Sequence, residues 1–311
     1  APMPVLVNTA RSHVQAGTPP SLQFDHVILA IRLPRGTRDD SLLATIDEED
    51  GELLFFDPTD ELTPLGRIRG ELQDNVGLLV LPDQSRLVTL PRALPDRTGI
   101  HRSARFRLDD RGTLAGSVVE TITGQEALAH RGALRAAPNQ REGNRIVELR
   151  LAQSLSAFNL VAATARNQDA IELPLQWEYE LSAPAFARNT GELVIIRPRV
   201  LGIEAVTLPG EDNKREHDLM LVEPRLSRDE VVIEIPAGFA VESLPDSVEI
   251  DAGFAAYRSQ TRFDGTTITY SRSHEIRELT IPASRIEEFR SLHREIARDE
   301  RAVVVLKKAG T

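Results

Sequence analysis

The first third of the chain contains short apolar runs separated by proline and glycine. Residues 27–31 are continuously apolar, which is typical of a strand buried on both faces. Residues 53–56 and 78–81 are two more runs of this kind, and a proline soon ends the first of these two, because proline cannot donate a hydrogen bond to a neighbouring strand. The pattern predicts a small sheet, with Asp50 and Gly51 as a hairpin turn.

After residue 100, apolar and polar positions alternate instead. The clearest case is residues 171–181, where every odd position is apolar. This predicts a strand with one face in a core and the other in water. Two helices interrupt the strands. Residues 125–137 form an alanine-rich one, and the second carries an apolar stripe that runs from Val147 to Phe158.

The last part of the chain continues with strands and closes with a helix. Asp264 and Gly265 join two alternating runs as a hairpin. Ser284 and Glu287 have the spacing of a capping box, which predicts the start of a helix. Because helices are few and strands are many, the predicted fold class is α+β, mainly β, with an α+β first segment followed by β-sandwich material and packed helices.

These elements divide into three predicted domains. Residues 1–92 form a partial core in which two strands carry a histidine and an aspartate. Residues 93–200 form a β-rich domain with two helices, and residues 201–311 form a C-terminal β-domain that ends in a helix and a strand. Residues 4–8 already have the pattern of a buried strand, and the chain begins at Ala1 without an initiator methionine, so we expect the natural protein to extend upstream.

The composition limits the chemistry and the partners of the chain. Its net charge of -10 argues against a nucleic-acid partner, because phosphate binding needs a basic face. No apolar run approaches the roughly 20 residues of a membrane span. The 311 residues include no cysteine, which excludes disulfides, thiolate metal sites and a thiol nucleophile within them. Phosphate-binding loops and serine-hydrolase elbows are absent from the sequence.

His26 and Asp57 are the candidate catalytic residues. His26 opens one predicted strand and Asp57 ends the next, so the two side chains would meet at one rim of the sheet if the strands are antiparallel neighbours. Asp57 would then accept a hydrogen bond from Nδ1 of the histidine and fix its tautomer. That is the orienting half of a triad that a cysteine thiolate would complete. On spacing alone, both residues also fit structural roles in a strand and a turn.

The residues around this pair resemble the second half of a bacterial transglutaminase-like core, which has a papain-type thiol fold. Residues 24–28 match the strand that the family's histidine opens, and residues 56–61 match the D-P-T motif in which the family's aspartate ends the next strand. Residues 108–114 and 235–239 are similar to the β-domain that follows such cores. The family's G-x-C-type motif, expected upstream of residues 4–8, is not in this sequence.

The resemblance implies an enzyme that acts on amide bonds through a thioester, by peptide or amide hydrolysis or by acyl transfer. His26 would shuttle the proton, Asp57 would orient His26, and the cysteine would come from the N-terminal part of the same protein, so this chain alone would be inactive. It implies a protein or peptide substrate, no metal or organic cofactor, and a periplasmic or cell-envelope location. The alternative is a non-catalytic envelope scaffold or binding protein with a degenerate core.

Other polar residues have simpler explanations. The six further histidines show no metal-ligand spacing, so we expect surface or packing roles for them. Asp60 and Glu61 follow Asp57 and could line a cleft, but a solvated loop is expected. The acidic run at residues 47–50 lacks the alternating ligands of a calcium loop. Trp177 falls on the core face of its strand and is expected to pack there.

Overall fold

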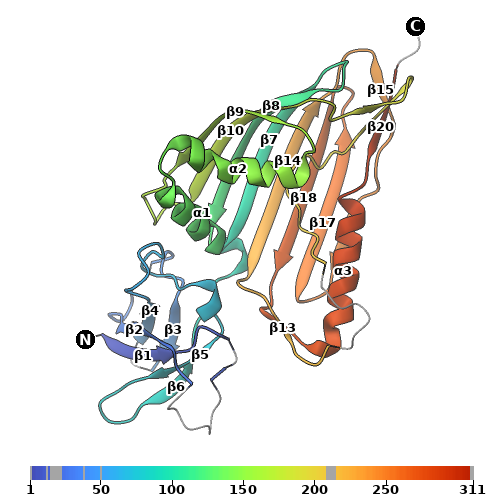
Figure 1. Cartoon of the computed structure of the whole chain (residues 1–311). Coiled ribbons are helices and arrows are strands. Elements are labelled where there is room, and N and C mark those ends of the chain that lie inside the picture. The colour runs from blue at the N-terminus through green and yellow to red at the C-terminus, as the bar shows by residue number, and fades with distance from the viewer. Residues whose placement is uncertain are drawn as a thin grey trace.

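The structure is a computed structural model that describes residues 2–11, 13–14, 23–37, 39–49, 51–207 and 215–308. It has two parts (Figure 1): a small unit of strands, β1 to β6, at the N-terminal end, and a large sheet with helices packed against it. Strands account for far more of the described residues than helices do, which confirms the predicted α+β, mainly β fold class.

The N-terminal unit is a six-stranded antiparallel sheet in the order β3-β4-β2-β1-β5-β6. Its strands are β1 (Met3–Val7), β2 (His26–Arg32), β3 (Thr45–Glu48), β4 (Gly51–Phe56), β5 (Val76–Leu79) and β6 (Arg86–Thr89). Consecutive residues of β4 are buried, as the apolar run predicted, since Leu53, Leu54 and Phe55 are at most 3% exposed. In β2, Val27 is 46% exposed, so the prediction of two buried faces was wrong there. Asp50, predicted in the β3–β4 turn, lies outside the described residues.

The large sheet has eight strands in the order β16-β17-β18-β14-β7-β8-β10-β9. They are β7 (Gly99–Leu108), β8 (Leu114–Thr123), β9 (Asn159–Arg166), β10 (Leu175–Ala183), β14 (Arg225–Glu234), β16 (Val248–Asp251), β17 (Ala255–Phe263) and β18 (Thr267–Ile276). Neighbours are antiparallel except β7 and β14, which are parallel. The sheet therefore takes strands from both predicted ranges, 93–200 and 201–311, and whether these ranges fold as separate units stays a prediction.

One face of the large sheet is buried and the other is open to solvent. Along β7, Ala104 and Phe106 are buried whereas Arg105 and Arg107 are exposed. The covering elements are α1 (Gln125–Ala136), α2 (Gln140–Ser154), α3 (Ile286–Asp299), and a small sheet of β11 (Arg188–Asn189), β12 (Leu193–Ile196), β20 (Val304–Lys308) and β15 (Phe239–Ser243). A two-stranded pair, β13 (Leu219–Met220) and β19 (Thr280–Ile281), completes the described strands. Trp177 is fully buried on this covered face, as predicted.

Charged residues cross the buried face in a line that we call the charge ladder, made of Glu120, Arg102, Asp229 and Arg272. Each is directly opposite the next on adjacent strands, from β8 through β7 and β14 to β18. Arg102 Nε donates to Glu120 Oε1 at 2.5 Å, Arg102 also donates to Asp229, and Arg272 Nε donates to Asp229 Oδ2 at 2.7 Å. All four side chains are at most 5% exposed, so each buried charge depends on its neighbours.

Three local predictions were wrong. β10 begins at Leu175 and not at residue 171, because the backbone turns before it and the carbonyl of Leu173 accepts a hydrogen bond from Arg131. α2 ends at Ser154, so Phe158 does not belong to its stripe. α3 begins one residue later than the capping-box spacing indicated: a 3-10 turn precedes it, its N-cap is Arg285, and no side chain caps it.

Candidate functional site

His26 and Asp57 meet at one rim of the six-stranded sheet. β2 and β4 are antiparallel neighbours, and their last pair toward this rim is Leu29 with Phe56. One step further along the register, Asp57 is level with Ile28, which lies on the same face of β2 as His26. The two side chains are therefore diagonal neighbours, and Nε2 of His26 lies 2.7 Å from Oδ2 of Asp57.

The carboxylate of Asp57 is fully buried and has several partners. Its Oδ1 accepts hydrogen bonds from the backbone N–H and the hydroxyl of Thr59, at 3.0 and 2.7 Å. A nitrogen of the Arg69 guanidinium lies 3.7 Å from its Oδ2. Burial raises the pKa of Asp57, but the hydrogen bonds from Thr59 and His26 outweigh burial and lower the pKa below its usual value. Asp57 is therefore ionised at neutral pH.

Asp57 bonds to Nε2 of the histidine ring, not to Nδ1 as predicted. An ionised carboxylate can only accept hydrogen bonds, so Nε2 must carry the proton when the ring is neutral. The lone pair of the neutral ring is then on Nδ1, and the side chain of His26 is 23% exposed. Asp57 thus holds His26 in the tautomer that can take up a proton at Nδ1.

The start of β2 is anchored to the end of β1, which fixes the backbone that carries His26. The carboxylate of Asp25 accepts hydrogen bonds from the backbone N–H and the hydroxyl of Thr9, at 2.8 and 2.7 Å. The side-chain amide of Asn8 donates to the carbonyl of Gln23 at 2.8 Å. These contacts fix the position of the backbone at His26.

The other candidates from the sequence do not join the pair. Asp60 accepts a hydrogen bond from the hydroxyl of Thr63 at 2.6 Å and so stabilises its own turn, and the side chain of Glu61 is 89% exposed. His274 is buried on the covered face of the large sheet, where its Nδ1 lies 2.9 Å from Glu204. Within the described ranges, no group of three or more histidine, aspartate or glutamate residues is arranged to hold a metal ion.

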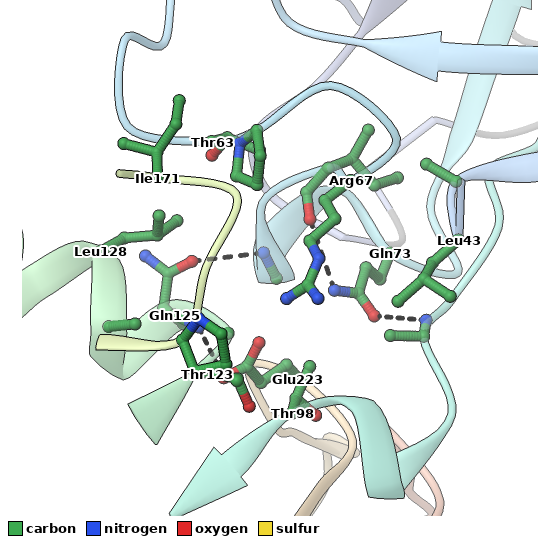
Figure 2. Close-up of a pocket in the computed structure, with 18 of the residues that line it drawn as sticks. Leu43, Thr63, Arg67, Gln73, Thr98, Thr123, Gln125, Leu128, Ile171 and Glu223 are labelled. Carbon is green, nitrogen blue, oxygen red and sulfur yellow. Dashed lines mark hydrogen bonds between the residues drawn. The ribbon is translucent and has the colours of Figure 1, made fainter. Parts of the chain in front are cut away.

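A pocket of about 650 Å³, counting its open mouth, lies where the N-terminal unit meets the large sheet (Figure 2). Leu43 and Arg67 contribute to it from the N-terminal unit, Leu128 from α1, Ile171 from the turn before β10, and Glu223 from the segment before β14. No pattern in the sequence predicted this site. These segments are far apart in the chain and none carries a local motif, so only their meeting in the fold makes the pocket.

Two polar residues join the N-terminal unit to the large sheet and the segments beside it, next to this pocket. The side-chain oxygen of Gln125, at the start of α1, accepts from the backbone N–H of Gly70 at 3.3 Å, and the backbone N–H of Gln125 donates to Oε1 of Glu223 at 2.8 Å. Arg11 donates to the carbonyls of Gly70 and Leu221, at 2.7 and 2.5 Å. Burial raises the pKa of Glu223 to about 7. The two parts of the molecule are thus joined by hydrogen bonds around the pocket.

Comparisons with known proteins match part of the chain to a family model and the chain to solved structures. The family described as a domain of unknown function with a solved structure, DUF3858, matches residues 192–306. Among solved structures, the chain is similar to a putative protease from Parabacteroides distasonis at 9% sequence identity and a TM-score of 0.44, with 98% of this chain and 40% of that chain covered. The chain therefore spans less than half the length of that protease. No curated protein matches the chain.

In the ranges that the structure describes, none of the helices has both the length and the apolar character that a membrane crossing requires.

Proposed function

We propose that this chain carries the histidine and aspartate of a transglutaminase-like cysteine enzyme that acts on amide bonds. The supporting observation is the buried Asp57, ionised at neutral pH, which holds Nε2 of the partly exposed His26 at 2.7 Å and leaves Nδ1 for a nucleophile. The resemblance of the surrounding residues to such cores agrees with this geometry. On the same resemblance we propose a protein or peptide substrate and a periplasmic or cell-envelope location.

In the proposed reaction, the nucleophile is a cysteine outside these 311 residues, which contain none. His26 takes the thiol proton at Nδ1, and the thiolate attacks the carbonyl carbon of the amide. The C–N bond then breaks, the amine leaves with the proton from His26, and a thioester remains. Water or a second amine attacks the thioester while His26 takes its proton. The thiol is released as the carboxylic acid or the new amide forms.

The test is the pH dependence of cysteine alkylation in the natural protein, with whatever sequence precedes this chain. A thiolate paired with protonated His26 should react with iodoacetamide already near pH 5 to 6, because the imidazolium lowers the thiol pKa. His26→Gln should move the reaction toward about pH 8.5, where an ordinary thiol ionises. Asp57→Asn should shift it in the same direction.

The matched control is His101→Gln, which changes an exposed histidine of β7 in the large sheet and should leave the profile unaltered. A profile that His26→Gln does not change would refute the proposal. A natural protein without any cysteine would do the same, and would favour the alternative function, a non-catalytic scaffold or binding protein.

A further inference from the structure

Two arginines, Arg67 and Arg131, line the pocket between the two parts of the molecule, and they differ in their hydrogen bonds. Arg131 is held by backbone carbonyls, since its Nη2 donates to Asn167, Ala170 and Leu173 at 3.2, 3.2 and 2.6 Å, although its buried Nε has no hydrogen-bond partner among the described residues. Arg67 differs, because no residue in the described part of the chain accepts a hydrogen bond from its guanidinium or forms an ion pair with it. Figure 2 shows this guanidinium extending into the middle of the pocket.

Glu223 faces Arg67 across the pocket (Figure 2). The charge of each residue shifts the pKa of the other, but among the described residues no ion pair joins them. One carboxylate oxygen of Glu223 accepts the backbone N–H of Gln125 at 2.8 Å, and the second is left for another donor. A group between Arg67 and Glu223 would satisfy both if it carried a carboxylate toward the arginine and an N–H toward the glutamate.

The apolar residues of the lining indicate that the rest of the ligand is apolar. Leu128 and Ile171 line the pocket with apolar side chains on one side of Arg67, and Leu43 does so on the other side (Figure 2). A carboxylate, an adjacent N–H and an apolar side group together describe an α-amino acid.

We propose that this pocket binds an apolar α-amino-acid unit, with its carboxylate on Arg67, its N–H on Glu223 and its side chain against apolar side chains of the lining. The source is either a free amino acid or the C-terminal residue of a peptide, which share this chemistry. This proposal rests only on the residues that line the pocket and does not depend on the cysteine chemistry proposed above.

The test is calorimetric titration of the purified chain with three matched probes. N-acetyl-L-leucine has the carboxylate, an amide N–H and an apolar side chain, and it should bind saturably. N-acetyl-L-leucinamide lacks only the carboxylate and should bind on the order of tenfold more weakly or worse, because a charged hydrogen bond is lost. L-leucine replaces the amide N–H by an ammonium. Tighter binding of L-leucine identifies a free amino acid as the ligand, and tighter binding of the acetylated probe identifies a peptide end.

A pair of variants separates specific recognition from general charge attraction. Arg67→Gln should weaken N-acetyl-L-leucine on the order of tenfold or more and leave the amide probe unaffected. Arg135→Gln removes a positive charge from α1 at a half-exposed position beside Glu61, outside the pocket, and should change neither affinity. The fluorescence of Trp177, buried in the sheet core, verifies that each variant is folded. The proposal is overturned by no saturable binding, by equal affinity for acid and amide, or by equal losses in both variants.

Discussion

Replacing Glu223 by glutamine should stabilise the protein at alkaline pH and leave its stability almost unchanged at acid pH. Burial between α1 and the segment before β14 raises the pKa of Glu223 from 4.5 to about 7, and Glu126 adds to this effect. The N–H of Gln125 and the charges of Arg225 and Arg67 act in the opposite direction but do not cancel it. The charged form of Glu223 is therefore disfavoured in the folded protein.

The sign and size of the effect follow from proton binding in the folded and unfolded states. The folded protein holds the proton more tightly, so the free energy of unfolding falls as pH rises from 4.5 to about 7 and stays lower above that window. Each pKa unit corresponds to about 1.4 kcal/mol, so the charged carboxylate costs about 3 kcal/mol at pH 8. Glutamine has no proton to lose in this range, and its side-chain oxygen can still accept the hydrogen bond from Gln125.

Urea denaturation near pH 4, 6 and 8 measures this effect. Trp177 is the one tryptophan of the chain, and its indole N–H donates to His130 of α1 at 3.3 Å, so its fluorescence reports on the region next to Glu223. The variant should match the wild type near pH 4 and exceed it by about 3 kcal/mol at pH 8. A constant difference at all three pH values, or a less stable variant at pH 8, would refute the reasoning.

Three further predictions concern the catalytic pair, the charge ladder and the contact between the two parts. Asp57→Asn should let the asparagine amide donate a hydrogen bond to Nε2 of His26, which favours the tautomer with the proton on Nδ1. The ¹⁵N chemical shifts of the imidazole should show this tautomer gaining population, and unchanged shifts would contradict the assigned tautomer. Asp229→Asn should lower the free energy of unfolding, measured by urea denaturation, by roughly 3 to 5 kcal/mol, because it leaves two buried guanidinium groups underpaired. The control Glu249→Gln breaks an exposed ion pair and should lower it by less than about 1 kcal/mol. Gly70→Ala places a Cβ 2.8 Å from a valine side chain across the interface and should lower stability by about 1 to 3 kcal/mol in thermal melts. Gly132→Ala on α1, with no atom nearer than 3.7 Å, should instead raise it by up to about 1 kcal/mol.

The sequence predicted the elements whose side chains follow a clear period. The apolar runs of β2 and β4 were sufficient to propose that His26 and Asp57 meet, because antiparallel neighbours bring the start of one strand to the end of the next. The alternation around Trp177 indicated a one-sided strand, and the structure has one there. In these strands burial decides which positions are apolar, so the order of apolar and polar residues predicts the strand and its buried face.

Elements without such a pattern were missed. β9 (Asn159–Arg166) is an edge strand with mostly exposed residues, so burial leaves little alternation in it. β6 (Arg86–Thr89) has only one buried residue, so burial leaves no apolar run or alternation in it. The pocket residues Arg67 and Glu223 belong to loops far apart in sequence, and local periodicity carries no information about which loops meet. The resemblance to a known core supplied the catalytic hypothesis but not the pocket.

The parallel pairing of β7 with β14 sets an order of events during synthesis. β7 can pair with β8 as soon as the hairpin leaves the ribosome, but its other neighbour, β14, is made much later. Until then β7 is an open edge with unpaired backbone groups, and Arg102 has Glu120 as its partner but not yet Asp229. A nascent chain that has not reached residue 225 therefore exposes a sheet edge and an underpaired arginine on the same strand. That strand is where we expect chaperones to bind the unfinished protein, and a product truncated before residue 225 to aggregate.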